Sequence, residues 1–306
     1  MALATKTINA INAAIEADQG ASFRALERVE FERACKDNGD AFNPRSGSRS
    51  HLGASLIGRQ CARALWYSFR WYAPSHFDGR MMRLFNRGHL EEMRFIALLK
   101  MIGCEVWCEG EDHKQLRITY GVGHFGGSLD AVIRGCPDLL PGEVALSEFK
   151  THSDASFTKL EKQGVADAKF EHWVQMQVYM HFFSLKYALY LAANKNNDAL
   201  YGEIVHYSKE QAERYVARGL SIVGSSEPPS KISNTPGWWQ CKSCDFRQVC
   251  HFKEKPEVTC RSCEHSQPGD VAGQWICRQC PALLTVLDPD MQKSKAKTCG
   301  AYTRLV

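Results

Sequence analysis

Two acidic residues and a lysine, Asp130, Glu148 and Lys150, have the types and spacing that could hold a metal ion beside a phosphate. Side chains of a β-strand alternate between faces and each residue advances about 3.3 Å, so Glu148 and Lys150 would project from one face about 6.6 Å apart. A carboxylate can hold a divalent cation, and a neighbouring ammonium can polarise a water molecule or a scissile phosphate. These residues are therefore the first candidates for a hydrolytic centre.

The surrounding pattern predicts a mixed α/β core with the acids and the lysine on its central strands. Apolar residues at helical spacing predict a helix over 82–103, and three β-prone runs after it predict a meander. The first 45 residues read as helical, polar and peripheral. The meander strands are expected at 115–120, 128–133 and 144–150, later helices at about 153–164, 168–184 and 209–222, and later strands at 187–192 and 200–207.

The loop from Gly121 to Gly127 formally matches the G-x-G-x-x-G pattern of dinucleotide-binding folds. That pattern requires a helix directly after the glycines, whereas a strand is expected there. The loop is therefore interpreted as a hairpin turn, and a nucleotide-binding fold is excluded.

Composition is that of an ordinary globular protein, with 306 residues, 44% hydrophobic and 24% charged. A net charge of +4 permits nucleic-acid binding through a local patch without arguing for it. No apolar run approaches the roughly 20 residues of a membrane span, and the N-terminus lacks an apolar signal region. We expect a cytoplasmic protein that does not contact membranes.

Cysteine usage points to metal binding in the C-terminal part of the chain. Eight of the thirteen cysteines lie between Cys241 and Cys299, several in pairs separated by two residues. In a reducing compartment this spacing indicates metal ligation rather than disulfides, and an odd count fits a disulfide framework poorly. We expect four parts: a helical region at 1–50, a catalytic core at 51–225, a first cysteine segment at 226–255 and a second at 256–306.

Four motifs in order resemble the PD-(D/E)XK nucleases, in particular the branch of RecB-type domains, CRISPR-associated adaptation nucleases and phage recombination exonucleases. The resemblance covers about residues 51 to 185 and implies a restriction-endonuclease-like core. Each motif alone is common by chance, but a chance occurrence of all four in this order is improbable. The motifs are Arg87-Gly88-His89-Leu90-Glu91-Glu92, Gly127-Ser128-Leu129-Asp130, Ser147-Glu148-Phe149-Lys150 and Gln175-Met176-Gln177-Val178-Tyr179.

The resemblance implies that His89, Asp130 and Glu148 bind Mg2+ or Mn2+ and that Lys150 is the catalytic lysine. Gln175 and Tyr179 lie four residues apart, so they would share a helix face beside this centre, where they could hold Lys150 or a DNA phosphate. Each residue also has a structural interpretation: a core histidine at position 89, a surface amide at 175, a cap of the glycine-rich hairpin at 130. Glu148 and Lys150 could likewise be a solvated ion pair, worth about 0.2 to 1 kcal/mol.

The sequence Cys241-x2-Cys244-x5-Cys250 supplies three thiolates, one short of a complete site. The same nuclease branch carries an iron-sulfur cluster with one early and three late cysteines, which implies that Cys61 completes a 4Fe-4S site. Such a cluster would tie together segments about 180 residues apart and stabilise the fold by several kcal/mol. The alternative is that Cys61 is a buried thiol and that the three cysteines bind zinc with His251.

Cys260-x2-Cys263-x13-Cys277-x2-Cys280 has the spacing of a zinc ribbon. Cys299 competes with Cys280 for the fourth position, and spacing favours Cys280 slightly. Four thiolates leave no open coordination position, so this zinc would be structural. The remaining cysteines, Cys35, Cys104, Cys108 and Cys136, are interpreted as packing residues.

Three arginines lie in the segments that flank the proposed metal site and are candidates for phosphate contacts. They are Arg59, Arg63 and Arg87. The aromatic residues interleaved with them could stack on bases, but an aromatic helix of this kind more often belongs to the core. We assign the DNA role to the arginines and the aromatics to the core.

These observations together predict a metal-dependent DNA exonuclease, phage-encoded, that resects ends in recombination, replication or repair. Its partners would be linear or single-stranded DNA ends, with a single-strand-binding or annealing protein as a further candidate. The same site would equally serve an endonuclease or a CRISPR-adaptation-type end trimmer. A catalytically inactive DNA-binding protein is disfavoured, because His89, Asp130, Glu148 and Lys150 are all present. Oligomeric state and cleavage polarity are not determined by the sequence.

Overall fold

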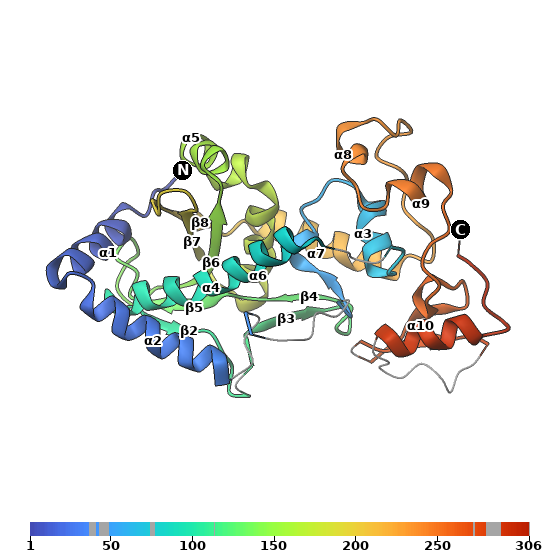
Figure 1. The fold of residues 1–306 in the computed structure, drawn as a ribbon, viewed down its shortest axis with the longest axis horizontal. Helices are drawn as coiled ribbons and strands as arrows, with labels where there is room; N and C mark the ends of the chain where they lie inside the picture. The colour runs from blue at the N-terminus through green and yellow to red at the C-terminus, as the bar shows by residue number, and fades with distance from the viewer. Residues whose placement is uncertain are drawn as a thin grey trace. The chain divides into compact units, whose positions relative to one another are not determined.

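The computed structural model describes residues 1–36, 41–42, 49–73, 77–112, 114–271, 273–279 and 289–305 (Figure 1). The chain forms two compact units that interleave along the sequence. The first comprises Met1–Arg45, Phe77–Ile118 and Ser128–Glu213, and the second comprises Ser46–His76, Thr119–Gly127 and Arg214–Val306. The four consecutive parts expected from the sequence stay a prediction.

The first unit is built on a five-stranded sheet with strand order β2-β5-β6-β7-β8. The central strands β6 and β7 are parallel and their other neighbours are antiparallel, so the sheet is mixed. This confirms the expected α/β class with a mixed sheet flanked by helices. The strands are β2 (Glu105–Trp107), β5 (Ala131–Arg134), β6 (Val144–His152), β7 (Tyr187–Asn194) and β8 (Leu200–His206).

Helices cover both faces of this sheet. On one side Phe149 of β6 stacks on Phe95 of helix α4 (Gly79–Met101), with ring centroids 5.1 Å apart. On the other side the parallel connection from β6 to β7 runs through α5 (Asp154–Ala168) and α6 (Phe170–Phe183). Alternation along β6 therefore directs Phe149 to one helical layer and its neighbours Glu148 and Lys150 to the other.

The N-terminal helices α1 (Thr5–Asp18) and α2 (Ala21–Lys36) were expected to be peripheral, and that expectation is wrong. Ala4 and Ile11 are fully buried members of the main core cluster. The backbone N–H of Ala4 donates to Gly202 of β8, and that of Thr7 donates to the Asp138 carboxylate. Apolar residues among the polar ones thus anchor this segment to the sheet.

The predicted three-stranded meander is also wrong, because the run 128–133 is divided between two sheets. β3 (Arg117–Tyr120) and β4 (Phe125–Ser128) pair with β1 (Leu52–Gly53) in a separate sheet of order β1-β4-β3. Only β5 joins the five-stranded sheet. Leu129 and Asp130 lie in the break, where Leu129 N–H donates to Leu116 and the Asp130 carboxylate accepts from Phe149 N–H. Gly121 and Gly123 adopt the positive φ angles that the expected turn before β4 requires.

The second unit contains α3 (Ala62–Phe69), most of α7 (Lys209–Gly224), and the short elements that carry the late cysteines. Its core is aromatic, as expected: Trp66, Tyr67, Phe69, Trp71 and Tyr72 are all buried. The late elements are α8 (Trp239–Lys242), α9 (Arg247–Phe252), the 3-10 turn Cys260–Ser262, β9 (Ser266–Pro268), β10 (Trp275–Cys277) and α10 (Pro289–Thr298). No helix in the described ranges is long and apolar enough to cross a membrane.

Helix α7 packs against β4 through a glycine. A Cβ atom added at Gly219 would lie 2.6 Å from a ring carbon of Phe125, which is fully buried. We expect Gly219→Ala to lower the free energy of unfolding by about 1 to 3 kcal/mol, because neither the ring nor the helix can move freely. Gly224→Ala, in the same helix with open space at Cβ, is the matched control. Urea unfolding of both variants checks this, and equal stabilities would contradict it.

Candidate functional site

Strand β6 and helix α6 bring most of the predicted catalytic residues together inside the first unit. Glu148, Lys150 and His152 alternate along β6 and therefore share the face toward α6. On α6, residues at spacings of three and four share the facing stripe. Tyr190 of β7 lies directly beside Glu148 in the parallel register. The facing stripe of α6 contains His172, Gln175 and Tyr179.

The Lys150 ammonium lies between the two carboxylates. Lys150 Nζ forms an ion pair with Glu148 Oε1 and is 3.7 Å from Asp130 Oδ2. It also donates to the Phe149 carbonyl at 2.9 Å. The Phe149 N–H donates to Asp130 Oδ2 at 2.7 Å, which fixes this acid against the edge of β6. The predicted pair of acids and the predicted lysine therefore converge.

Gln175 links helix α6 to the same cluster. Its Nε2 donates to Glu148 Oε2 at 3.1 Å, and both side chains are buried. Tyr179, which is 1% exposed, lies next to Gln175 on the helix. Gln175 thus acts on Glu148, where a hydrogen bond to Lys150 or a phosphate was the expectation.

Burial governs the electrostatics of the cluster. Burial raises the pKa of Glu148, and the Lys150 ammonium partly opposes that rise. For Lys150, burial acts to lower the pKa, but the carboxylates of Glu148 and Asp130 outweigh it and raise the pKa above its ordinary value. Lys150 therefore stays charged, and it balances part of the negative charge of the two acids.

The two carboxylates offer hard oxygen ligands that suit Mg2+ or Mn2+. Glu148 Oε1 is paired with the Lys150 ammonium, so a divalent ion held by the two carboxylates would share or displace that contact. In the described ranges no three histidine, cysteine or acidic side chains are arranged to hold a metal, and His89 of α4 makes no hydrogen bond or ion pair to Asp130 or Glu148. The donor set of the acid pair fits a divalent ion, whereas the part expected of His89 stays a prediction.

A neutral network adjoins the cluster, and the sequence reasoning missed it. The Tyr190 hydroxyl lies 2.8 Å from His152 Nε2 and 2.9 Å from His172 Nδ1, so it donates to one imidazole and accepts from the other. Burial, together with Lys169 and Lys150, lowers the pKa of His152 to about 3. Burial and Lys150 lower that of His172 to about 2. The available signal was the spacing of His152, which continues the Glu148 and Lys150 alternation.

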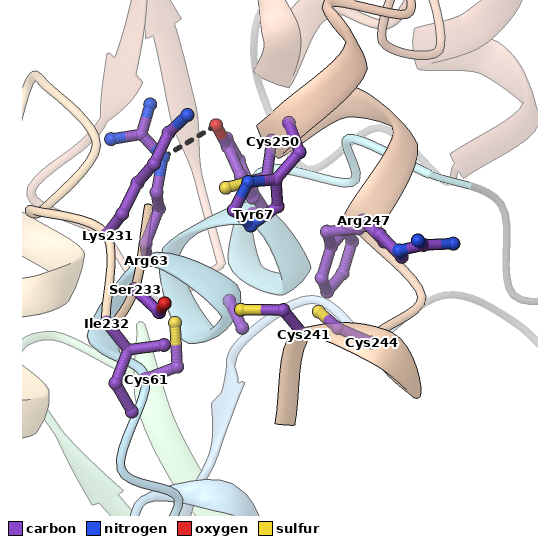
Figure 2. A pocket seen from close by; sticks show the side chains of 13 residues that line it. Cys61, Arg63, Tyr67, Lys231, Ile232, Ser233, Cys241, Cys244, Arg247 and Cys250 are labelled. Atoms are coloured by element: carbon purple, nitrogen blue, oxygen red, sulfur yellow. Dashed lines mark hydrogen bonds between the residues drawn. The ribbon is translucent and has the colours of Figure 1, made fainter. Parts of the chain in front are cut away.

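The second unit brings together the four cysteines predicted to share an iron-sulfur cluster. Cys61 precedes α3, Cys241 lies in α8, Cys244 follows α8, and Cys250 lies in α9. All four line one cavity of about 20 Å³, and Figure 2 shows their sulfur atoms turned toward a common space. Burial raises the pKa of Cys250, the nearby Arg63 and Lys231 oppose that rise, and the thiols of Cys61 and Cys241 add to it. Early and late cysteines are therefore neighbours, as the pattern required.

Basic side chains and a histidine line the same cavity (Figure 2). Arg63 donates to the Tyr67 hydroxyl at 2.8 Å and to the Pro229 carbonyl at 2.9 Å, so it helps to hold the cavity wall. His251 also lines the cavity, which keeps the zinc alternative open.

The other two arginines predicted to contact DNA, Arg59 and Arg87, are exposed.

The last cysteine group is partly described. Burial raises the pKa of Cys260 to about 11, and the thiols of Cys277, Cys263 and Cys299 contribute to that rise. Cys280 lies outside the described residues. Among the cysteines assigned to packing, Cys104 and Cys136 are buried and Cys108 is half-buried, but Cys35 is exposed on α2, so that assignment is wrong for Cys35.

Comparison with solved structures gives limited likeness. The crystal structure of SSO0001 aligns with a TM-score of 0.41 and 18% identity over 78% of this chain and 99% of that chain. LHK-Exo in complex with dAMP aligns at 0.39 and 15% identity, over 56% and 86%. The alkaline exonuclease LHK-Exo from Laribacter hongkongensis aligns at 0.38 and 14% identity, over 57% and 87%.

No protein-family model matches the chain, and no curated protein shows significant similarity to it. TM-scores below 0.5 at such identities do not establish a fold or an activity. The residues of the site must therefore carry the functional argument.

The neutral imidazoles give stability a definite pH dependence. Because His152 and His172 are unprotonated when folded but have pKa values near 6.5 when unfolded, the unfolded state binds more protons below about pH 6.5. The contribution of these two histidines to stability then falls as pH drops from 7 to 5. We expect His152→Gln and His172→Asn each to reduce this fall by about 1 to 2 kcal/mol in urea titrations. An unchanged pH slope in both variants would show that the imidazoles are protonated in the folded state.

Proposed function

We propose that this chain is a divalent-metal-dependent nuclease of the PD-(D/E)XK type that hydrolyses DNA phosphodiester bonds, and that it acts as an exonuclease on linear ends. The observation that carries the proposal is the cluster in which Lys150 lies between the buried Glu148 and the half-buried Asp130. Two acids and a lysine gathered at one point of β6 are the groups that metal-assisted phosphoryl hydrolysis needs. We further propose that it serves end resection in recombination, replication or repair and is phage-encoded.

The residues have separable roles in this chemistry. Asp130 and Glu148 would hold one or two Mg2+ or Mn2+ ions, which supply an activated water and neutralise charge on the phosphate. Lys150 keeps its proton and offers an N–H group to a phosphate oxygen, where it stabilises developing negative charge. Gln175 fixes the orientation of Glu148 through its 3.1 Å hydrogen bond, and Phe149 N–H fixes Asp130. No covalent intermediate with the protein is needed.

Substitution of the cluster tests the proposed reaction. We expect Lys150→Ala and Asp130→Asn each to reduce Mg2+- or Mn2+-dependent cleavage of linear DNA at least about 100-fold, because each removes charge that acts on the reacting phosphate. Asp130→Asn keeps the shape that accepts the Phe149 N–H, so it guards against a folding defect in Lys150→Ala. Lys186→Ala, which removes an exposed lysine, is the control.

Full activity of both cluster variants would overturn the mechanism. Closed circular DNA should survive incubation with the wild-type enzyme, and its degradation would favour an endonuclease instead. A chelator should stop cleavage and leave the circular dichroism spectrum unchanged.

We propose that Cys61, Cys241, Cys244 and Cys250 bind a 4Fe-4S cluster and that Cys260, Cys263 and Cys277 bind zinc with Cys280 or Cys299. The shared cavity lined by the first four thiols supports the cluster. Four thiolate ligands would make the bound cluster negatively charged, and the surrounding Arg63, Lys231 and Arg247 would offset that charge. Both sites would be structural, because cysteine thiolates would fill all the coordination positions that the protein can supply and leave none open for a substrate.

Anaerobic purification tests the cluster. We expect a brown protein that contains iron, and we expect Cys61→Ser to lose the visible absorbance, most of the iron and several degrees of thermal stability. Cys35→Ser, at an exposed cysteine outside the cavity, should retain all three. Zinc in place of iron, with no colour, would favour the Cys3His alternative that uses His251.

A further inference from the structure

Two lysines, Lys169 and Lys195, lie near His152, the last residue of β6, which follows Lys150 by two residues. The backbone N–H of Lys195, directly after β7, donates to the His152 carbonyl at 2.8 Å. Lys169, at the junction of α5 and α6, donates to the Ser156 hydroxyl, which lies 3.5 Å from His152 Nδ1. Both lysines are therefore held beside the carboxyl ends of the parallel strands β6 and β7. In open α/β sheets this is the end at which ligands bind.

A third cation joins them from helix α4. The Arg87 guanidinium donates to the Lys195 carbonyl at 2.9 Å. Arg87 and Arg80 lie near enough to lower the pKa of Lys195, although its partial burial is the larger cause. Burial and then Lys159 likewise lower the pKa of Lys169. These shifts show that positive groups gather here and repel one another.

Two acids near this group have their own contacts. Asp154, at the start of α5, accepts from the Asn194 side chain at 3.0 Å. Glu91 forms an ion pair with Arg94, and it is also close enough to Arg87 and Asp198 to feel their charges. In the part of the chain that the structure describes, Lys169, Lys195 and Arg87 form no ion pair with any carboxylate. Holding like charges together without counterions costs free energy, so an anionic partner is expected to compensate for it.

The network of His152, His172 and Tyr190 separates this group from the catalytic cluster. Because both imidazoles are neutral, the network adds no charge, and it fixes the spacing between Lys150 and the outer lysines. His152 is two residues beyond Lys150 on the same face of β6, an advance of about 6.6 Å. The cations therefore continue the line that begins at the proposed catalytic lysine.

We propose that Lys169, Lys195 and Arg87 form a binding site for the DNA phosphates that flank the bond held at Lys150. In this proposal the bound DNA strand passes over the carboxyl ends of β6 and β7. This inference rests on the proposed function, since it takes DNA as the polyanion. Lys169 and Lys195 contribute point charges, and the exposed Arg87 can bind a phosphate in a bidentate manner.

Salt-dependent binding tests this site independently of catalysis. A fluorescently labelled single-stranded oligonucleotide is titrated with protein in EDTA at several salt concentrations, and anisotropy gives the binding constant. For each lost phosphate contact, the slope of log K against log salt should become shallower by about 0.7. We expect this change in Lys169→Gln, Lys195→Gln and Arg87→Gln. Lys186→Gln is the matched control, because Lys186 precedes the opposite end of β7 and is exposed.

The outcomes separate the two proposals. Slopes in Lys169→Gln and Lys195→Gln equal to the wild-type slope would overturn the phosphate site, even if the wild-type enzyme cleaves DNA. An equal change in Lys186→Gln would also overturn it, since the effect would then reflect overall charge. Reduced slopes together with a wild-type protein that never cleaves DNA would support the phosphate site and remove the nuclease proposal. Thermal melts confirm that each variant is folded.

Discussion

The ion pair between Lys150 and Glu148, with Asp130 close by, is the interaction around which the first unit is organised. Charges inside a protein are costly unless each has a partner of opposite sign and further hydrogen bonds. The Phe149 peptide supplies two of these hydrogen bonds, its N–H to Asp130 and its carbonyl to Lys150. Helix α6 supplies another through Gln175. A strand and a helix are thus both required to keep the charged cluster in place.

The layers of the unit follow from that requirement. β6 places apolar side chains such as Phe149 on α4 and polar ones on α6, so one strand serves the core and the cluster together. The residues before α1 bond to the edge strand β8, and Ile11 of α1 joins the core cluster that contains Phe95 and Phe149, which explains why a polar N-terminal segment is part of the core. Rigid support of this kind is what a reactive centre needs, since small displacements weaken electrostatic catalysis.

Positive side chains have different neighbours in the two units. In the first, the cations beyond His152 have no carboxylate partners among the described residues, which is consistent with a phosphate-bearing partner. In the second, four thiols share a small cavity with arginine and lysine side chains. Positive groups beside thiols favour the thiolate form that metal ligation needs. Both arrangements gather positive side chains at the places for which a negatively charged partner is proposed.

Local periodicity was sufficient for part of this site. Alternation in β6 placed Glu148 and Lys150 on one face, and helical spacing placed Gln175 and Tyr179 on one stripe. The pairing of Cys61 with the late cysteines came from the resemblance to a nuclease branch, not from periodicity. Tertiary structure alone decided the rest. Asp130 reaches the cluster because a predicted strand breaks between two sheets, and His172 of α6 stacks on His152 of β6 while both contact Tyr190 of a third element. Such contacts join residues distant in sequence, and no local pattern encodes a distance across packed layers.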